Sequence, residues 1–268
     1  MADSSCELQK ALNAFQNYCD EWHLTVNTDK TKVMIFSRGK VKKFPVFSFG
    51  NCQLEVTYDY TYLGIKFNYN GKFDKAIDKQ VSQARRAMYS LITKARRLQL
   101  PVDIQCELFE QLIVPILLYG SEVWGYCKLD RIEIFYRKFL KQILHLRTTT
   151  PNCMVYGELG RNELRTKIEH RMITFWSRIV SGKQHKISVA LYQLLSKLYD
   201  NDIYKDSWLT KIHDTLNTNE LNFLWFNYEG FNAEWIKQTS KLRINDIECP
   251  LVKQHTDTHF ALTTTLRT

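Results

Sequence analysis

The hydrophobic pattern changes its period near Asn70-Gly71, and this change limits the fold more strongly than any other feature. From Thr31 to Phe67, apolar, aromatic and β-branched residues form short runs punctuated by glycine and proline, which is typical of strands. From Lys72 to Arg97, apolar residues recur every three or four positions without an interior glycine or proline, which predicts one long amphipathic helix. We therefore expect an α+β fold in which three or four short antiparallel strands precede a mainly helical body.

The same three-to-four-residue spacing predicts helices elsewhere in the chain. Residues 5–22 are expected to be helical, because Ser4 and Glu7 stand at capping-box spacing before a periodic apolar run. Another helix is predicted over about residues 129–145, and several more between 162 and 240. A helix that starts after Pro101 should be kinked or ended by Pro115, which lacks a backbone donor. Its expected core face consists of Ile104, Leu108, Leu112 and Ile116.

The charge of the chain favours contact with polyanions. Lysine and arginine number 37 against 28 acidic residues, which gives a formal net charge of +9 and a pI near 9.1. RNA, DNA and anionic lipid are all candidate partners for such a surface. The alternative is a mildly basic protein whose charge has no specific partner.

Cysteine usage and hydropathy indicate a compartment. The 7 cysteines are an odd number and are scattered singly, and no secretory leader precedes them. The longest apolar run, residues 112–118, is far shorter than the roughly 18 residues of a membrane span. We expect an intracellular protein, nuclear or cytoplasmic, that is neither secreted nor bound to a membrane. Cys249, His255 and His259 lie close together but fall short of the four ligands of a structural zinc site, so no metal site is predicted.

Three motifs occur in a fixed order: the stretch from Trp22 to Phe36, then Tyr62-Leu63-Gly64, then the stretch from Tyr119 to Gly125. In this order they resemble the reverse transcriptases of non-LTR (LINE-type) retrotransposons, over about residues 5–245. The resemblance begins just after the place where that family has its F/Y-A-D-D aspartate pair, and this chain contains no Asp-Asp dipeptide. It implies a fragment of an RNA-directed DNA polymerase that is inactive alone. The intact enzymes use magnesium, whereas no cofactor is expected in this chain.

The resemblance also implies a division into segments. Residues 1–70 would be part of a palm, with antiparallel hairpin strands, and residues 71–147 a thumb-like helical region. A C-terminal helical region would occupy 148–248. The last residues, 249–268, lose the apolar periodicity and are expected to be disordered. Because the strands that complete a palm are absent, a sheet edge and an apolar face should be exposed, and self-association is expected.

The residues that would contact nucleic acid follow from the same motifs. Lys30, with Lys32 as its neighbour, corresponds to the lysine of motif D, which lies near the phosphates of the incoming nucleotide. Tyr62 and Gly64 correspond to the primer-grip hairpin, where glycine allows close approach of the backbone. The helix 72–97 contains eight basic and two acidic residues. It would bind RNA or RNA/DNA duplex without sequence preference, chiefly through Arg85, Arg86, Arg96 and Arg97.

Each of these features also has an interpretation without nucleic acid. Lys30 also fits a solvated basic turn before a strand, and the basic helix also fits a solvated helix face. At the level of the whole chain, the alternatives are a non-enzymatic helical interaction protein and an inert translated relic of the element.

Overall fold

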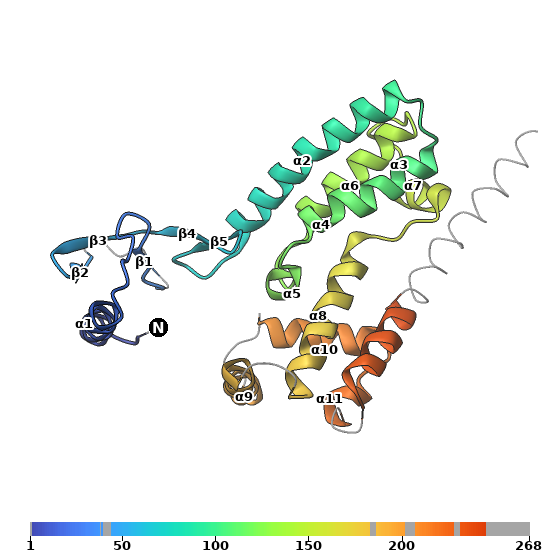
Figure 1. Ribbon diagram of the computed structural model, residues 1–268. Coiled ribbons are helices and arrows are strands. Elements are labelled where there is room, and N and C mark those ends of the chain that lie inside the picture. Colours follow the sequence, from blue (N-terminus) through green and yellow to red (C-terminus); the bar gives the residue numbers. More distant parts are fainter. Residues whose placement is uncertain are drawn as a thin grey trace, which may run out of the picture. The chain divides into compact units, whose positions relative to one another are not determined.

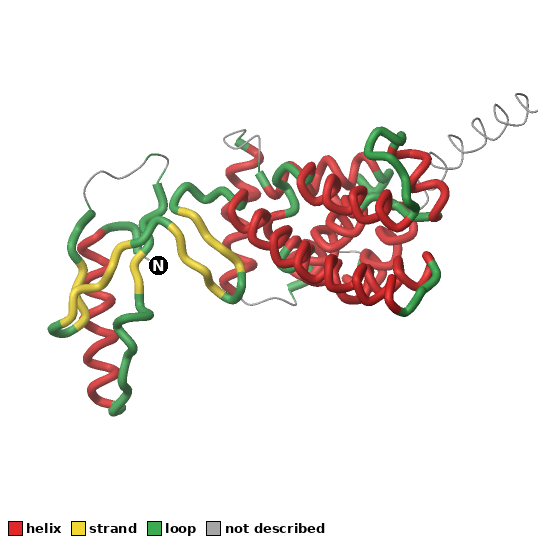
Figure 2. Tube along the Cα trace, turned by 90° about the horizontal axis from the view of Figure 1, so that it is seen from above, coloured by secondary structure: helices red, strands yellow, loops and turns green. Residues whose placement is uncertain are grey.

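The chain folds into two units, residues 1–79 and 80–268. The structure is a computed structural model that describes residues 2–37, 39, 44–182, 186–201, 207–227 and 231–244. The division falls inside helix α2 (Asp74–Arg97), so this helix begins in unit 1 and continues into unit 2 (Figure 1). All described strands belong to unit 1, and the described part of unit 2 is helical (Figure 2). The α+β class is thus confirmed, while the palm, thumb and C-terminal segments stay predictions and 249–268 lies outside the described residues.

Unit 1 opens with helix α1 (Ser5–Glu21), close to the predicted range of 5–22. The Ser4 hydroxyl accepts a hydrogen bond from the backbone N–H of Glu7 at 3.2 Å, which confirms the predicted cap. At the other end, His23 adopts a left-handed conformation with φ of 51°, and the Leu24 N–H donates to the Cys19 carbonyl at 2.8 Å. This closing turn satisfies a carbonyl that the helix leaves unpaired.

Five short strands follow α1 and form two small sheets. The first sheet has the order β1 (Lys32–Val33), β3 (Cys52–Val56), β2 (Phe47–Phe49), and the second is a hairpin of β4 (Asp59–Tyr62) and β5 (Ile65–Asn68). The β2–β3 and β4–β5 pairs are antiparallel, as predicted, but β1 pairs with β3 in parallel. The prediction of three or four antiparallel strands is wrong in both respects. Period-two patterning marks a strand and does not fix its direction, which here depends on the crossing between β1 and β2.

The core of unit 1 is small and joins the first sheet to α1. Val33, Phe47 and Leu54, one from each strand, are buried together, and Leu8 and Leu12 of α1 pack against them. Since leucines four positions apart lie on one face of a helix, α1 covers one side of the sheet with its apolar stripe.

The free edge of β2 is covered by side chains of α1, so the exposed sheet edge that the sequence predicts does not lie at this strand. The Gln9 side chain donates to the Ser48 carbonyl at 2.9 Å and accepts from the Ser48 N–H at 3.0 Å, so one amide pairs both polar groups as a neighbouring strand would. About two turns later, the Gln16 side chain accepts from the Gly50 N–H at 2.6 Å. Helix α1 therefore satisfies the exposed backbone of this strand, which reduces its tendency to pair with another chain.

Unit 2 begins with the rest of α2 and a broken helical segment that contains Pro115. This segment consists of α3 (Val102–Leu108), a π-helical turn η1 (Phe109–Ile113) and α4 (Val114–Leu117). The Val114 N–H donates to the Phe109 carbonyl five residues back, so the wide turn lies directly before the proline. The predicted interruption near Pro115 is therefore confirmed.

The predicted core face of this segment is wrong. Ile104 and Leu112 are exposed, by 41% and 56%, whereas Phe109 and Ile113 are fully buried. The buried side is instead the stripe of Phe109, Ile113 and Leu117, which has the same spacing of four residues. The apolar spacing therefore allowed two faces, and the stacking of Phe109 on aromatic rings of another helix decided which face is buried.

The remaining helices build the larger core around buried tryptophans. The predicted helix near 129–145 is α6 (Asp130–Ile143), and its expected apolar residues Ile132, Tyr136, Phe139 and Ile143 are all buried. Trp124 and Trp176 are fully buried as well. The other helices are α5 (Ser121–Trp124), α7 (Asn152–Leu159), α8 (Leu164–Val180), α9 (Lys186–Asp200), α10 (Trp208–Thr218), α11 (Phe223–Asn227) and a helical stretch over 233–244.

The stretch from Tyr119 to Gly125 acts in packing. Gly120 has φ of 72° and precedes α5, and the Trp124 indole N–H donates to the Tyr119 carbonyl at 2.9 Å. Gly125 lies against α8, where an added Cβ would come within 2.5 Å of the Ile168 side chain. Only glycine allows this close approach.

A buried carboxylate links three helices of unit 2. Glu133 of α6, which is 3% exposed, accepts a hydrogen bond from the Tyr156 hydroxyl at 3.0 Å and from the Arg165 N–H at 2.7 Å. Arg165 lies in the first turn of α8, where backbone N–H groups lack partners inside the helix, so a side chain from α6 caps α8. Burial raises the pKa of Glu133 above its ordinary value of 4.5.

This arrangement predicts opposite effects for two substitutions at one position. The pKa of Glu133 is higher in the folded chain than its ordinary value of 4.5. The folded chain therefore loses stability as the pH rises from that ordinary pKa through the pKa of the folded state, because the buried carboxyl must ionise. Glu133→Gln can still accept from the Arg165 N–H through its oxygen and can donate its amide to the Tyr156 hydroxyl, which reverses the direction of that bond. Because the amide does not ionise, the stability of this variant relative to the native chain should increase toward neutral pH. Glu133→Ala leaves the Tyr156 and Arg165 donors unpaired and should destabilise by roughly 1–3 kcal/mol. Urea unfolding at several pH values measures both. A Gln variant as unstable as the Ala variant would contradict the interpretation.

The exposed apolar surface of unit 1 predicts self-association through α1. Phe15, Tyr18 and Trp22 are 48%, 50% and 62% exposed and lie on one side of the helix. Replacing Tyr18 and Trp22 with lysine should shift the purified chain toward monomer in sedimentation velocity at increasing concentration. Conversely, Gln9→Ala with Gln16→Ala uncovers the β2 edge and should increase association. A native chain that is monomeric and melts cooperatively would show that this surface does not self-associate.

Candidate nucleic-acid interface

The loop after α1 holds Lys30 on an ordered turn. The Asn27 side-chain oxygen accepts from the Lys30 N–H at 3.0 Å, and the Asn27 carbonyl accepts from the Thr31 N–H at 3.1 Å and its hydroxyl at 2.8 Å. Asparagine commonly closes turns in this way, since its short side chain reaches the backbone ahead of it. The Lys30 side chain is exposed, and in the part of the chain that the structure describes it makes no ion pair.

Lys32, two residues later, has a different environment. The parallel β1–β3 register places it opposite Glu55, and the two side chains form an ion pair. The ammonium of Lys32 is therefore partly neutralised within the fold. Of the two lysines predicted in this motif, Lys30 offers the freer positive charge.

The β4–β5 hairpin closes through a two-residue turn, Leu63-Gly64. Their φ values are 46° and 84°, and a hairpin turn with positive φ at both central residues suits the twist of the strands. Glycine adopts this conformation freely, whereas a branched residue such as leucine pays about 1–2 kcal/mol. Leu63 is nevertheless 72% exposed, and Tyr62 beside it is 59% exposed. An apolar tip held in a costly conformation is typical of a functional segment.

Basic residues at the start of α2 secure this hairpin. The Asp59 carboxylate of β4 pairs with the Lys75 ammonium at 2.7 Å and with that of Lys66 at 3.7 Å. The Lys75 hydrogen bond is the main cause that lowers the pKa of Asp59. The Lys79 ammonium donates to the Gly64 carbonyl at 3.2 Å. These two lysines therefore act in the fold of unit 1, although the sequence pattern grouped them with the phosphate-binding face.

Among the predicted site residues, those on the second half of α2 form the most basic exposed surface. Its apolar side is buried at Ala84, Met88 and Ala95. Its other side exposes the four predicted arginines and Lys94, and none of these five makes an ion pair within the described ranges: Arg85, Arg86, Lys94, Arg96 and Arg97. Exposed, unpaired guanidinium groups are suited to phosphate contacts.

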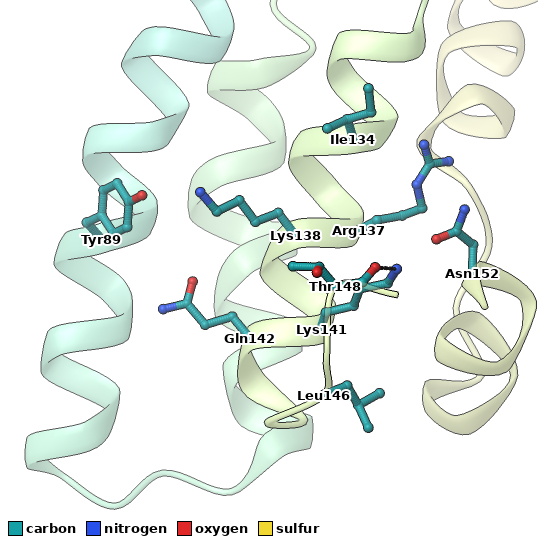
Figure 3. A pocket seen from close by; sticks show the side chains of 9 residues that line it. All are labelled: Tyr89, Ile134, Arg137, Lys138, Lys141, Gln142, Leu146, Thr148 and Asn152. Carbon is teal, nitrogen blue, oxygen red and sulfur yellow. Dashed lines mark hydrogen bonds between the residues drawn. The ribbon is translucent and has the colours of Figure 1, made fainter. Parts of the chain in front are cut away.

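A groove next to this surface was missed by the sequence analysis. It has a volume of about 770 Å³ and lies between α2, α6 and the segment after α6 (Figure 3). Tyr89 comes from α2, the basic residues Arg137, Lys138 and Lys141 come from α6, and none of its lining residues is acidic. The sequence does show three basic residues within about one turn of α6, and this cluster was the signal that could have indicated the site.

The predicted site residues thus fall into separate places. Lys30 and the Tyr62-Gly64 turn belong to different segments of unit 1, and the four arginines belong to unit 2. No group of three or more histidine, cysteine or acidic residues that could hold a metal occurs among the described residues. They do not fit the magnesium ions of the intact polymerases, and the zinc candidates Cys249, His255 and His259 lie outside the described ranges. No described helix has the length and apolarity of a membrane span.

Comparison with known proteins identifies relatives among mobile elements. The chain is 23% identical over 165 residues to the RNA-directed DNA polymerase from mobile element jockey of Drosophila funebris, and 26% identical over 141 residues to that of Drosophila melanogaster. The resemblance to non-LTR retrotransposon reverse transcriptases is confirmed. The matches cover 57% and 51% of this chain but only 18% and 15% of the two polymerases.

A third relative extends this picture. The chain is 26% identical over 171 residues to a transposon-derived protein of Caenorhabditis elegans, and the match covers 60% of this chain and 58% of that protein. No family model and no solved structure matches the chain. The relationship therefore rests on sequence, and the assignment of palm and thumb remains a prediction.

Proposed function

We propose that this chain is a reverse-transcriptase-derived protein that binds RNA or RNA/DNA duplex without sequence preference and has no polymerase activity alone. The observation that supports it most is the row of exposed, unpaired arginines along the second half of α2. Contacts between arginine and phosphate give affinity without reading bases, which suits a surface that follows any primed template.

The proposed lack of polymerase activity follows from the carboxylates. Nucleotide addition by such polymerases needs acidic side chains that hold two magnesium ions beside the reacting phosphate. The chain has no Asp-Asp dipeptide, and its acidic residue in the hairpin, Asp59, is already paired with Lys75. Lys30 alone could place a proton near phosphate, but it has no reaction to assist without the metal ions.

The surface on α2 predicts a specific effect of charge reversal. Replacing Arg85, Arg86, Arg96 and Arg97 with glutamate should abolish binding of a labelled RNA/DNA duplex in fluorescence anisotropy. In the native chain, affinity should fall steeply with salt. A plot of the logarithm of the binding constant against the logarithm of the salt concentration should have a slope of roughly −0.9 for each phosphate contact. Neutralising one arginine at a time should reduce this slope by about one.

A matched variant separates local contacts from overall charge. Replacing Lys10, Lys128, Lys186 and Lys197 with glutamate also lowers the formal net charge of +9 by eight, to +1. These lysines are exposed and lie outside α2. The control should bind duplex far better than the α2 variant. Equal loss in both would show that net charge, and not this helix, governs binding.

A primer-extension assay tests the catalytic part of the proposal. The purified chain should not add deoxynucleotides to a primed RNA template in the presence of Mg²⁺ or Mn²⁺. Incorporation that persists through purification and is lost on Lys30→Ala would contradict the proposal.

A non-enzymatic interaction protein is the second candidate, and α9 favours it. Ile187, Leu191 and Leu194 of this helix are 60%, 47% and 53% exposed, and their spacing places them on one face. On this alternative, RNA binding would be weak and insensitive to salt, so the salt titration above distinguishes the two candidates. An intracellular location, nuclear or cytoplasmic, is part of both.

A further inference from the structure

The groove between α2 and α6 combines two chemistries that recognise a nucleotide. One wall presents the Tyr89 ring, which is 46% exposed and stacks on no other ring among the described residues. Helix α6 contributes three cations to the lining, of which Lys138 extends toward Tyr89 in Figure 3, whereas Arg137 and Lys141 extend toward Asn152 and Thr148. An aromatic face can stack on any base, and ammonium and guanidinium groups bind the adjoining phosphates.

One cation of the groove, Lys141, is held in place by the fold. Helix α6 ends in a left-handed turn at His145, where φ is 53° and the Leu146 N–H donates to the Lys141 carbonyl at 2.9 Å. The chain then folds back, so that the Lys141 ammonium donates to the Thr148 carbonyl at 2.8 Å. This contact uses one of three ammonium donors and leaves the charge without an acidic partner.

The other two cations are also available for a ligand. Lys138 is exposed, makes no ion pair in the described ranges and extends toward Tyr89 in Figure 3. Arg137 reaches Glu163 only at 4.0 Å, the limit of an ion pair. With three positive charges and no acidic lining residue, the groove attracts an anion. An anion that also carries an aromatic base could contact the Tyr89 ring, whereas a simple anion could not stack on it.

Tyr89 also connects the groove to the arginines of α2. It lies four residues after Arg85 and seven before Arg96, so these side chains follow one exposed stripe of the helix. A strand whose phosphates lie on this stripe would pass the mouth of the groove. A duplex keeps its bases stacked on each other, so only an unpaired nucleotide can place its base against Tyr89.

We propose that the groove binds one nucleotide of a single-stranded RNA or DNA segment, with the base stacked on Tyr89 and the adjoining phosphates on Lys138 and Lys141. This inference deepens the proposed function, because it rests on nucleic-acid binding and adds a site selective for the unpaired part of a template-primer. The groove volume of about 770 Å³ falls within the range of roughly 300–1,000 Å³ typical of small-ligand sites.

The test compares Tyr89→Leu with two controls in the full-length chain. Tyr89→Phe keeps the ring, and Tyr119→Leu makes the same chemical change at an exposed tyrosine outside the groove. Fluorescence anisotropy is measured with labelled oligouridine, oligothymidine and an RNA/DNA duplex. Tyr89→Leu should weaken single-strand binding by about 5- to 150-fold and duplex binding by less than about twofold. Both controls should bind the single strands as the native chain does.

Further measurements locate the contact and separate the outcomes. Oligouridine with 5-iodouridine should photocross-link to the peptide that contains Tyr89, and Lys138→Gln should reduce the single-strand salt slope by about 0.7. Comparison of the oligouridine and oligothymidine arms decides between RNA and DNA.

If the native chain binds single strands and Tyr89→Leu leaves this binding unchanged, the groove assignment fails while the proposed function stands. If the native chain binds no nucleic acid, both fail. Equal competition by polyglutamate would overturn the nucleotide site in favour of an acidic peptide.

Discussion

The rest of the structure depends on the division of helix α2 into two faces and two halves. Its first turns use Lys75 and Lys79 to hold the β4–β5 hairpin through Asp59 and Gly64. Its later turns bury Ala84, Met88 and Ala95 and expose arginines. Because one uninterrupted helix must satisfy both tasks, its 24 residues contain no glycine or proline.

The basic residues of the chain form two groups, those that pair with acidic residues of the fold and those that do not. Lys32 and Lys75 are paired with Glu55 and Asp59, so their charge contributes to unit 1. The α2 arginines and Lys138 lack acidic partners in the described part of the chain, and their charge is available to phosphates. Surface ion pairs stabilise a fold only slightly, so their larger consequence here is to determine which positive charges remain available to a ligand.

Much of the fold could be predicted because local patterns dominate it. The helices at 5–22 and near 129–145, the start of α2 after Gly71 and the interruption near Pro115 all follow from apolar spacing, caps and proline. The predictions were wrong where a distant contact decided the outcome. The parallel β1–β3 pairing depends on a chain crossing, and the β2 edge is satisfied by glutamines of α1. Packing of Phe109 against the rings of α6 decided which of two apolar faces of the α3–α4 segment is buried.

The sequence by itself determined the relationship to non-LTR reverse transcriptases, the basic character of α2 and the lack of an aspartate pair, because these are properties of residue identity and order. Tertiary structure alone decided which cations remain unpaired and which aromatic ring shares a groove with Lys138. Lys138 and Tyr89 are 49 positions apart, and their common groove exists only because α2 and α6 lie at its two sides. The burial of Glu133 has the same origin, since its partners Tyr156 and Arg165 come from two other helices.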